Sequence, residues 1–181
     1  MPVFIALLRG INVSGHKPVP MAELQKVFAA LGFPGAKTYI QSGNVVFKSA
    51  EKDGKRVAAA LEAGILKKFG FEVPVIVRTP EQLSAALSGN PYAKAKASEN
   101  ERVYITYLEH PPAKEAVKAL HAFSDPVDEL KVVKTEVYIL ARNGYGKSKL
   151  SNTFVEKKLG VRATTRNLET TAKLITMAEA Q

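Results

Sequence analysis

The sequence predicts an α+β protein made of two fused ferredoxin-like halves, each with the order βαββαβ, a mainly antiparallel sheet and an extra helix after it. Two observations predict this class. Short runs rich in β-branched and aromatic residues alternate with segments of helical periodicity, and the same order occurs twice along the chain. The first run, residues 3–8, is apolar at every position, so both of its faces need cover and it belongs at the centre of a sheet.

The first half takes residues 1–90. Apolar residues recur at helical spacing in two segments, which Gly32 and Gly70 are placed to end. Between these segments, Ser42-Gly43 separates two β-rich runs, which is a hairpin signal. The predicted elements are a strand at 3–8, a helix at 20–31, strands at 37–41 and 44–48, a helix at 57–69, a strand at 73–78 and a short helix at 80–87.

The second half takes residues 101–181 and follows a linker at 91–100, a stretch that is poor in apolar residues. The halves share the order of their elements but not their residues, and we expect a structural duplication. The predicted elements are a strand at 102–108, a helix at 112–123, strands at 130–134 and 136–141, a helix at 148–159, a strand at 162–165 and a helix at 168–178.

Composition limits the class of protein. The chain has 181 residues, of which 46% are hydrophobic and 24% charged, as is typical of a globular protein with its own core. The absence of cysteine excludes disulfides and thiolate metal sites. The N-terminus lacks the pattern of a signal peptide, and no apolar run is long enough to span a bilayer. We therefore expect a cytoplasmic protein with no membrane partner.

The net charge of +9 allows two interpretations. A lysine-rich surface keeps a protein soluble, and on charge alone this is the simpler interpretation. A partner that carries phosphates, such as a nucleotide or a nucleic acid, would also require excess positive charge. Much of that excess lies between residues 142 and 173, which hold eight basic residues and two acids.

Two polar turns of the first half are candidate binding sites. Arg9 and Asn12 follow the buried first strand directly, where donors can converge on a ligand. Gln41, Ser42 and Asn44 concentrate amide and hydroxyl groups at the tip of the predicted hairpin. The alternative for both turns is structural, because glycine and asparagine turns need these residue types in any case.

Two further turns of the second half are candidates for an anion. The stretch 143–148 ends in Gly-Lys-Ser before a predicted helix, but Ala141 stands where a P-loop needs glycine, so we reject an NTPase of that type. Lys147 and Ser148 remain candidates at a helix N-terminus. Thr165 and Arg166 are candidates to complete an anion pocket, and Asn167 is placed either to join them or simply to cap the last helix.

Other chemistry finds little support. His16, His110 and His121 lack the spacing of metal ligands, and we predict neither a metal site nor a cofactor. No nucleophile-elbow motif is present. The predicted strand at 44–48 carries one aromatic residue, where an RNA-recognition module needs two or more.

The chain resembles a bacterial family of proteins, domain of unknown function 1697. The matching stretches are I-A-L-L-R-G-I-N-V from Ile5, P-M-A-E-L from Pro20, T-Y-I-Q-S-G-N-V-V-F from Thr38, T-T-R-N from Thr164, and Lys173-Leu174. The resemblance implies two fused ferredoxin-like halves and no established activity.

Three functional hypotheses follow. The leading one is a binding module for an anionic, phosphate-bearing ligand, a nucleotide or a nucleic acid. The second is an enzyme of unassigned reaction in which Arg9, Lys147 and Arg166 stabilise a developing negative charge. The third is a protein-interaction module whose polar turns only cap secondary structure. The sequence leaves the oligomeric state open, as well as whether the four turns form one pocket.

Overall fold

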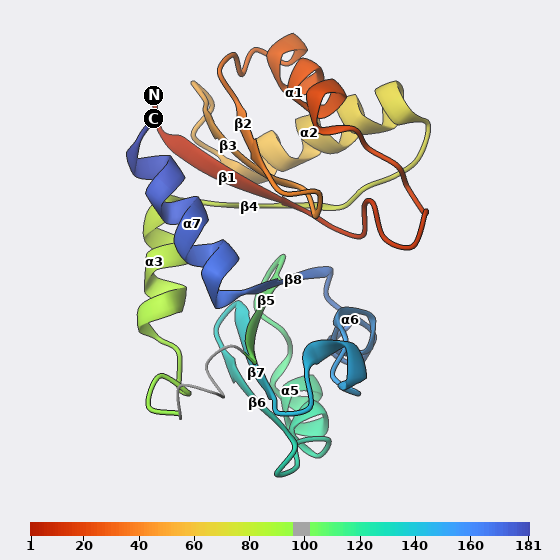
Figure 1. Cartoon of the computed structure of the whole chain (residues 1–181), viewed down its shortest axis with the longest axis vertical. Helices are drawn as coiled ribbons and strands as arrows, with labels where there is room; N and C mark the ends of the chain where they lie inside the picture. Colours follow the sequence, from red (N-terminus) through yellow and green to blue (C-terminus); the bar gives the residue numbers. More distant parts are fainter. Residues whose placement is uncertain (96–101) are drawn as a thin grey trace. The chain divides into compact units, whose positions relative to one another are not determined.

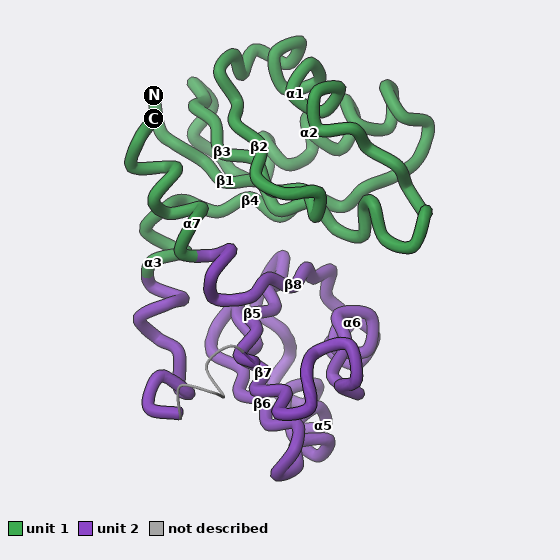
Figure 2. The backbone as a smooth tube through the Cα atoms, viewed as in Figure 1, with its two compact units in different colours: residues 1–84, 172–181 green, residues 85–171 purple. Residues whose placement is uncertain are grey.

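The computed structural model describes residues 1–95 and 102–181. The described chain divides into two compact units, one formed by residues 1–84 with 172–181 and the other by residues 85–171 (Figure 2). Residues 96–100 of the predicted linker lie outside the described residues, so the division at 91–100 remains a prediction. No helix in the described part of the chain is both long and apolar enough to cross a membrane.

The first unit contains one antiparallel sheet with the strand order β2-β3-β1-β4. Two helices, α1 and α2, pack on one face of this sheet (Figure 1). Its elements are β1 (Val3–Leu8), α1 (Met21–Ala30), β2 (Lys37–Tyr39), β3 (Asn44–Lys48), α2 (Gly54–Phe69), β4 (Val75–Arg78) and the first part of α3 (Pro80–Ser88).

The alternation of side chains along β1 builds the core of this unit. Phe4, Ala6 and Leu8 point to the face that carries α1 and α2, where they join one buried apolar cluster. Ile5 and Leu7 point to the other face and are fully buried as well. The prediction that both faces of the first strand are covered is therefore confirmed.

The second unit repeats this arrangement with the strand order β6-β7-β5-β8, again antiparallel. Helices α5 and α6 contribute to one buried cluster with the sheet. Its elements are the end of α3, β5 (Val103–Leu108), α5 (Lys114–His121), β6 (Asp128–Val133), β7 (Glu136–Ala141), a 3-10 turn η1 (Tyr145–Lys147), α6 (Asn152–Leu159), β8 (Ala163–Asn167) and the first part of α7 (Leu168–Glu179).

The protein is thus a mixed α+β protein with two similar halves, as the sequence predicts. Most element boundaries differ from the predicted ones by one to four residues, and two of these differences affect candidate site residues. The helix predicted from residue 148 begins at Asn152, because Ser151 is its N-cap and accepts a hydrogen bond from the N–H of Phe154 at 3.2 Å. The strand predicted to end at residue 165 continues to Asn167. The second difference changes which side chains share a face of the sheet.

Candidate functional site

The first candidate site consists of two loops of the first unit that are joined by hydrogen bonds. We call residues 9–19 and 39–44 the loop pair. The side-chain amide of Asn12 donates to the carbonyl of Gln41 at 2.8 Å and to that of Val19 at 3.0 Å. Its oxygen accepts from the N–H of Val19 at 2.8 Å. One side chain therefore closes the first loop and fastens it to the second.

The first loop ends in a small, well-defined tip. The N–H of Asn12 donates to the carbonyl of Lys17, and the N–H of His16 donates to that of Val13. Ser14 and Gly15 between them have φ values of 48° and 76°, which is the backbone of a type I′ hairpin turn. Lys17 is held in turn, because its ammonium donates to the carbonyl of Glu72 at 2.6 Å.

The second loop closes against the end of β1. The N–H of Leu8 donates to the carbonyl of Gly43 at 2.8 Å. Gly43 has a φ of 85°, and a Cβ at this position would lie 2.7 Å from both Ile11 Cδ1 and Leu8 Cβ. The amide of the buried Asn44 donates to the carbonyl of Tyr39 at 2.9 Å and to the hydroxyl of Ser42 at 3.0 Å. The turn is therefore built from the polar residues that the sequence singles out.

Two of the four predicted turns therefore lie together, and side-chain hydrogen bonds within the loop pair hold them in place. The side-chain amides of Asn12 and Asn44 donate in these hydrogen bonds. Arg9 is partly exposed and begins the loop, and Lys17 keeps two of its three N–H donors beyond the one bound to Glu72. Whether the loop pair binds a ligand stays a prediction.

The side chains of Thr165 and Arg166, which were predicted to share an anion pocket, lie on opposite faces of the sheet. Because β8 continues to Asn167, the alternation of side chains places Thr165 with Asn167 on one face and Arg166 with Thr164 on the other. Arg166 is buried and donates to the Thr164 hydroxyl at 2.7 Å. Burial lowers the pKa of Arg166 to about 10, so its guanidinium is still protonated at neutral pH.

Thr165 is the centre of a hydroxyl network that the sequence analysis missed. Its hydroxyl lies 2.8 Å from that of Thr106, donates to the side-chain oxygen of Asn152 at 2.9 Å and accepts from Tyr145 at 3.2 Å. Tyr145 also stacks on Tyr104, with ring centroids 4.5 Å apart. Burial raises the pKa of Tyr145. These bonds use the donor and both acceptor positions of the Thr165 hydroxyl, and whether Thr165 takes part in binding stays a prediction.

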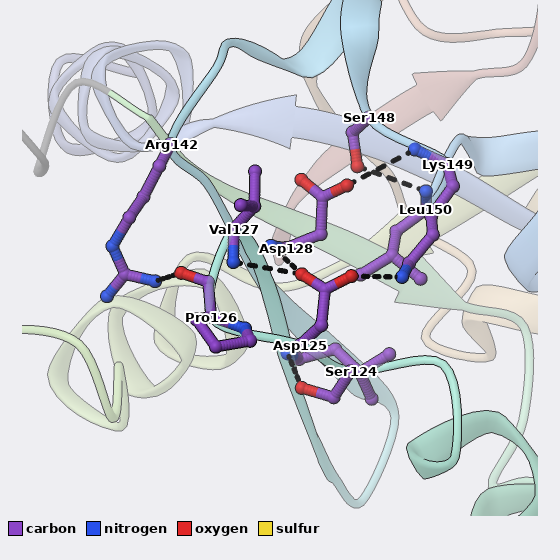
Figure 3. A network of polar contacts seen from close by, with 10 residues as sticks. Ser124, Asp125, Pro126, Val127, Asp128, Arg142, Ser148, Lys149 and Leu150 are labelled. Carbon is purple, nitrogen blue, oxygen red and sulfur yellow. Dashed lines mark hydrogen bonds and ion pairs between the residues drawn. The ribbon is translucent and has the colours of Figure 1, made fainter.

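The turn around Lys147 and Ser148 does not provide the expected helix N-terminus. Lys147 is exposed in η1, and the hydroxyl of Ser148 accepts from the N–H of Leu150 at 3.0 Å (Figure 3). α6 begins only at Asn152, so its first N–H groups follow Ser151, whereas the prediction placed the helix start at Ser148. The prediction that Gly-Lys-Ser opens a helix is therefore wrong.

Two carboxylates lie beside this turn (Figure 3). Asp128 accepts from the N–H of Lys149 at 3.4 Å, and Asp125 forms an ion pair with the Lys149 ammonium. The Lys149 hydrogen bond, together with the N–H groups of Asp128 and Val127, lowers the pKa of Asp125 to about 2. The positive charges of Lys147 and Lys149 in this turn therefore have two carboxylates beside them.

The structure assigns Asn167 a capping role. Its side-chain oxygen accepts from the N–H of Thr170 at 2.8 Å, which confirms the predicted cap of the last helix. Across the described residues, no group of three or more His, Asp or Glu side chains is arranged to hold a metal ion.

Comparisons with known proteins agree with this architecture. The solved structure of a conserved bacterial protein from Streptococcus pneumoniae has a TM-score of 0.78 and 23% identity, with 99% of each chain covered. At this identity the likeness concerns the fold alone. The comparison with curated proteins gave no match. A family model described as protein of unknown function (DUF1697) matches residues 1–138, and the chain therefore belongs to this family.

Proposed function

We propose that the first unit binds an anionic, phosphate-bearing ligand, a nucleotide or a nucleic acid, at the loop pair. The observation that carries this proposal is the charge around these loops. Residues 1–50 contain five basic residues and a single acid, Glu23. That carboxylate already forms ion pairs with Lys26 at 2.6 Å and with Lys68 at 2.8 Å. The loop pair itself contains the cations Arg9 and Lys17 and no acid.

The loop pair also offers hydrogen-bond donors in a fixed arrangement. In the part of the chain that the structure describes, the N–H groups of Ser14 and Gly15 at the tip have no acceptor within the protein. Phosphate oxygens accept strong hydrogen bonds from such N–H groups and from arginine and lysine. Because Asn12 and Lys17 already fix the first loop, binding would require little additional ordering of the backbone.

Finer aspects of the fold and location belong to the same proposal. We infer that each half is a ferredoxin-like unit, which the element order βαββαβ and the equivalent strand orders of the two sheets support. A cytoplasmic location fits the absence of cysteine. An enzyme that uses Arg9, Lys147 and Arg166, and a protein-interaction module, remain the alternative hypotheses.

The test compares two pairs of charge removals. Arg9→Ala combined with Lys17→Met removes both cations of the loop pair, whereas Lys114→Ala combined with Lys118→Ala removes two charges from α5 in the second unit. Binding of AMP, inorganic phosphate and a short DNA strand is measured by calorimetry, with thermal unfolding as the check on folding. We expect the first pair to weaken binding at least about tenfold and the second to leave it unchanged.

Equal losses in both pairs would instead indicate a general effect of charge, and no binding by the wild type would refute the proposal. The dependence on salt separates the two kinds of ligand. The affinity for a strand that contacts several phosphates falls steeply with salt concentration, whereas that for a single nucleotide falls less.

A further inference from the structure

We propose that the ligand of the loop pair is a nucleoside phosphate, free or within a single strand, whose base rests on Val13 and Ile40 while its phosphate contacts Arg9 and Lys17. This inference rests on the proposed function and adds the residues that contact the base of the ligand. It is based on two exposed apolar side chains of the loop pair, which binding of an anion alone would not require.

Ile40 is an unusual residue for its position. It is β-branched, its φ is 50°, and 48% of it is exposed. Glycine or asparagine normally occupies a left-handed position, because the side chain of a β-branched residue crowds the backbone there. Here the unfavourable conformation holds an apolar side chain in solvent, at the start of the turn that Gly43 closes. Strain of this kind is concentrated at functional sites.

Val13 is the second exposed apolar side chain of the loop pair, with 58% of it accessible. It follows Asn12 directly, and Ile40 directly precedes Gln41. Since the Asn12 amide donates to the Gln41 carbonyl at 2.8 Å, the two apolar residues are carried by the backbone segments that this hydrogen bond joins. The loop pair therefore combines cations, polar turn residues and two aliphatic side chains.

This combination fits a nucleoside phosphate better than a bare phosphate. A nucleobase has apolar faces that pack on apolar side chains, and polar edges that accept and donate hydrogen bonds. Inorganic phosphate or a sugar phosphate would leave Val13 and Ile40 in water. An anionic lipid surface also pairs charge with apolar contact, but interfacial segments bury a broad apolar face, and two β-branched side chains supply a small one.

The test measures how much the base adds to binding. The affinities of ribose 5-phosphate, AMP and a short single strand of DNA are compared in the wild type and in Ile40→Gly and Val13→Ser. In the wild type we expect AMP to bind about tenfold more tightly than ribose 5-phosphate. In both variants this advantage should shrink, while the affinity for ribose 5-phosphate should change little.

Ile40→Gly carries a second signature. Glycine adopts a φ of 50° without strain, so the melting temperature should rise while AMP binding weakens. Lys134→Gly is the matched control, because Lys134 has a φ of 55° in the hairpin of the second unit. It should raise the melting temperature and leave AMP binding unchanged. Val133→Ser controls for the loss of an exposed valine, since 42% of Val133 is accessible.

The outcomes distinguish the inference from the function on which it rests. Equal affinities for AMP and ribose 5-phosphate would overturn the inference and leave the anion site standing. Failure of all three ligands to bind would overturn both. Binding to vesicles that contain phosphatidylglycerol, lost in Ile40→Gly and without affinity for AMP, would overturn it in favour of a lipid surface. A higher affinity for the strand than for AMP would support the inference and identify the source as nucleic acid.

Discussion

The two halves of the chain share the pairing register of their sheets but differ in their surface loops. β1 reads V-F-I-A-L-L and β5 reads V-Y-I-T-Y-L, so their first, third and sixth residues are identical. The third residue of each strand, Ile5 or Ile105, pairs with an arginine of the fourth strand, Arg78 or Arg166. Both arginines are buried, and both donate to the carbonyl of the preceding residue.

The halves also protect the edge of the sheet in the same way. The first N–H of β4, that of Val75, donates to the carboxylate of Glu62 in α2 at 2.9 Å. The first N–H of β8, that of Ala163, donates to the carboxylate of Glu156 in α6 at 2.8 Å. In each half a glutamate of the second helix satisfies a group that an edge strand would otherwise expose. These shared contacts support a duplication at the level of residues, which the sequence analysis did not detect.

The difference lies in the connection after the first strand. In the first half, residues 9–20 form the long loop that begins with Arg9 and is fixed by Asn12. In the second half the connection is only residues 109–113, and it begins with Glu109, which forms an ion pair with Arg162 at 2.6 Å. The comparison teaches that the scaffold is common to both halves, whereas the loop proposed to bind an anion belongs to the first alone.

The largest effect on stability is expected where the hairpin of each half is hydrogen-bonded to the end of the first strand of that half. Gly43 and Thr135 both accept a hydrogen bond there, from the N–H groups of Leu8 and Leu108. Only Gly43 has a left-handed backbone and no room for a Cβ. Gly43→Ala should therefore lower the free energy of unfolding by about 2–4 kcal/mol. Thr135→Ala, as the matched change, should cost less than about 1 kcal/mol.

Urea unfolding of the two variants checks this prediction. Similar costs for Gly43→Ala and Thr135→Ala would show that the two hairpins tolerate a side chain equally. The packing difference between the halves would then be smaller than the contacts at 2.7 Å indicate.

An intermediate effect is expected in the sheets themselves. Thr106 pairs with Thr165 in the second half, at the register position where Ala6 pairs with Val77 in the first. Thr165→Val removes the hydroxyl that serves both Thr106 and Tyr145, so we expect a loss of about 1–3 kcal/mol. Adding Thr106→Ala recreates the apolar pair of the first half, and the double variant should cost less than the sum of the single changes.

A double-mutant cycle from chemical denaturation measures this coupling. Strictly additive costs would mean that the Thr106 hydroxyl finds another partner once Thr165 is replaced. In that case the network would stabilise the second unit less than its short distances imply.

Much of the fold follows from local patterns, because the period of two in the strands and the glycines at the helix ends are visible in the sequence. Asn167 was predicted as a cap for the same reason, since its acceptor role depends on residues that follow immediately. The helix start at 148 was predicted because Gly-Lys-Ser is typical of a helix start. In the structure the N-cap is Ser151, three residues further on, so the helix begins later.

The candidate site was less predictable because it depends on contacts between distant residues. The hydrogen bond from Asn12 to Gln41 joins residues 29 positions apart, and no local pattern indicates it. Thr165 and Arg166 illustrate a different failure. Once a strand extends through both, neighbouring side chains must point to opposite faces, so the error came from ending the strand too early.

The smallest effect concerns two partly exposed carboxylates, one in each half. Hydrogen bonds from Lys26 and then Lys68 lower the pKa of Glu23 from its ordinary value of 4.5 to about 2. That of Asp125 is lowered from 3.8 to about 2, first by Lys149 and then by backbone N–H groups. Because each pKa is lower in the folded protein, each carboxylate stabilises the fold above its ordinary pKa and loses this contribution as the pH falls toward 2.

Glu23→Gln and Asp125→Asn should therefore each flatten the decline in stability between about pH 4.5 and 2, as measured by urea unfolding at several pH values. Salt should separate the two halves. Glu23 depends on lysines at the surface, so added salt should screen its effect. Asp125 also accepts from two backbone N–H groups, at 2.8 and 2.9 Å, which salt screens less. Equal salt sensitivity in the two variants would show that the backbone bonds do not distinguish Asp125 from an ordinary surface ion pair.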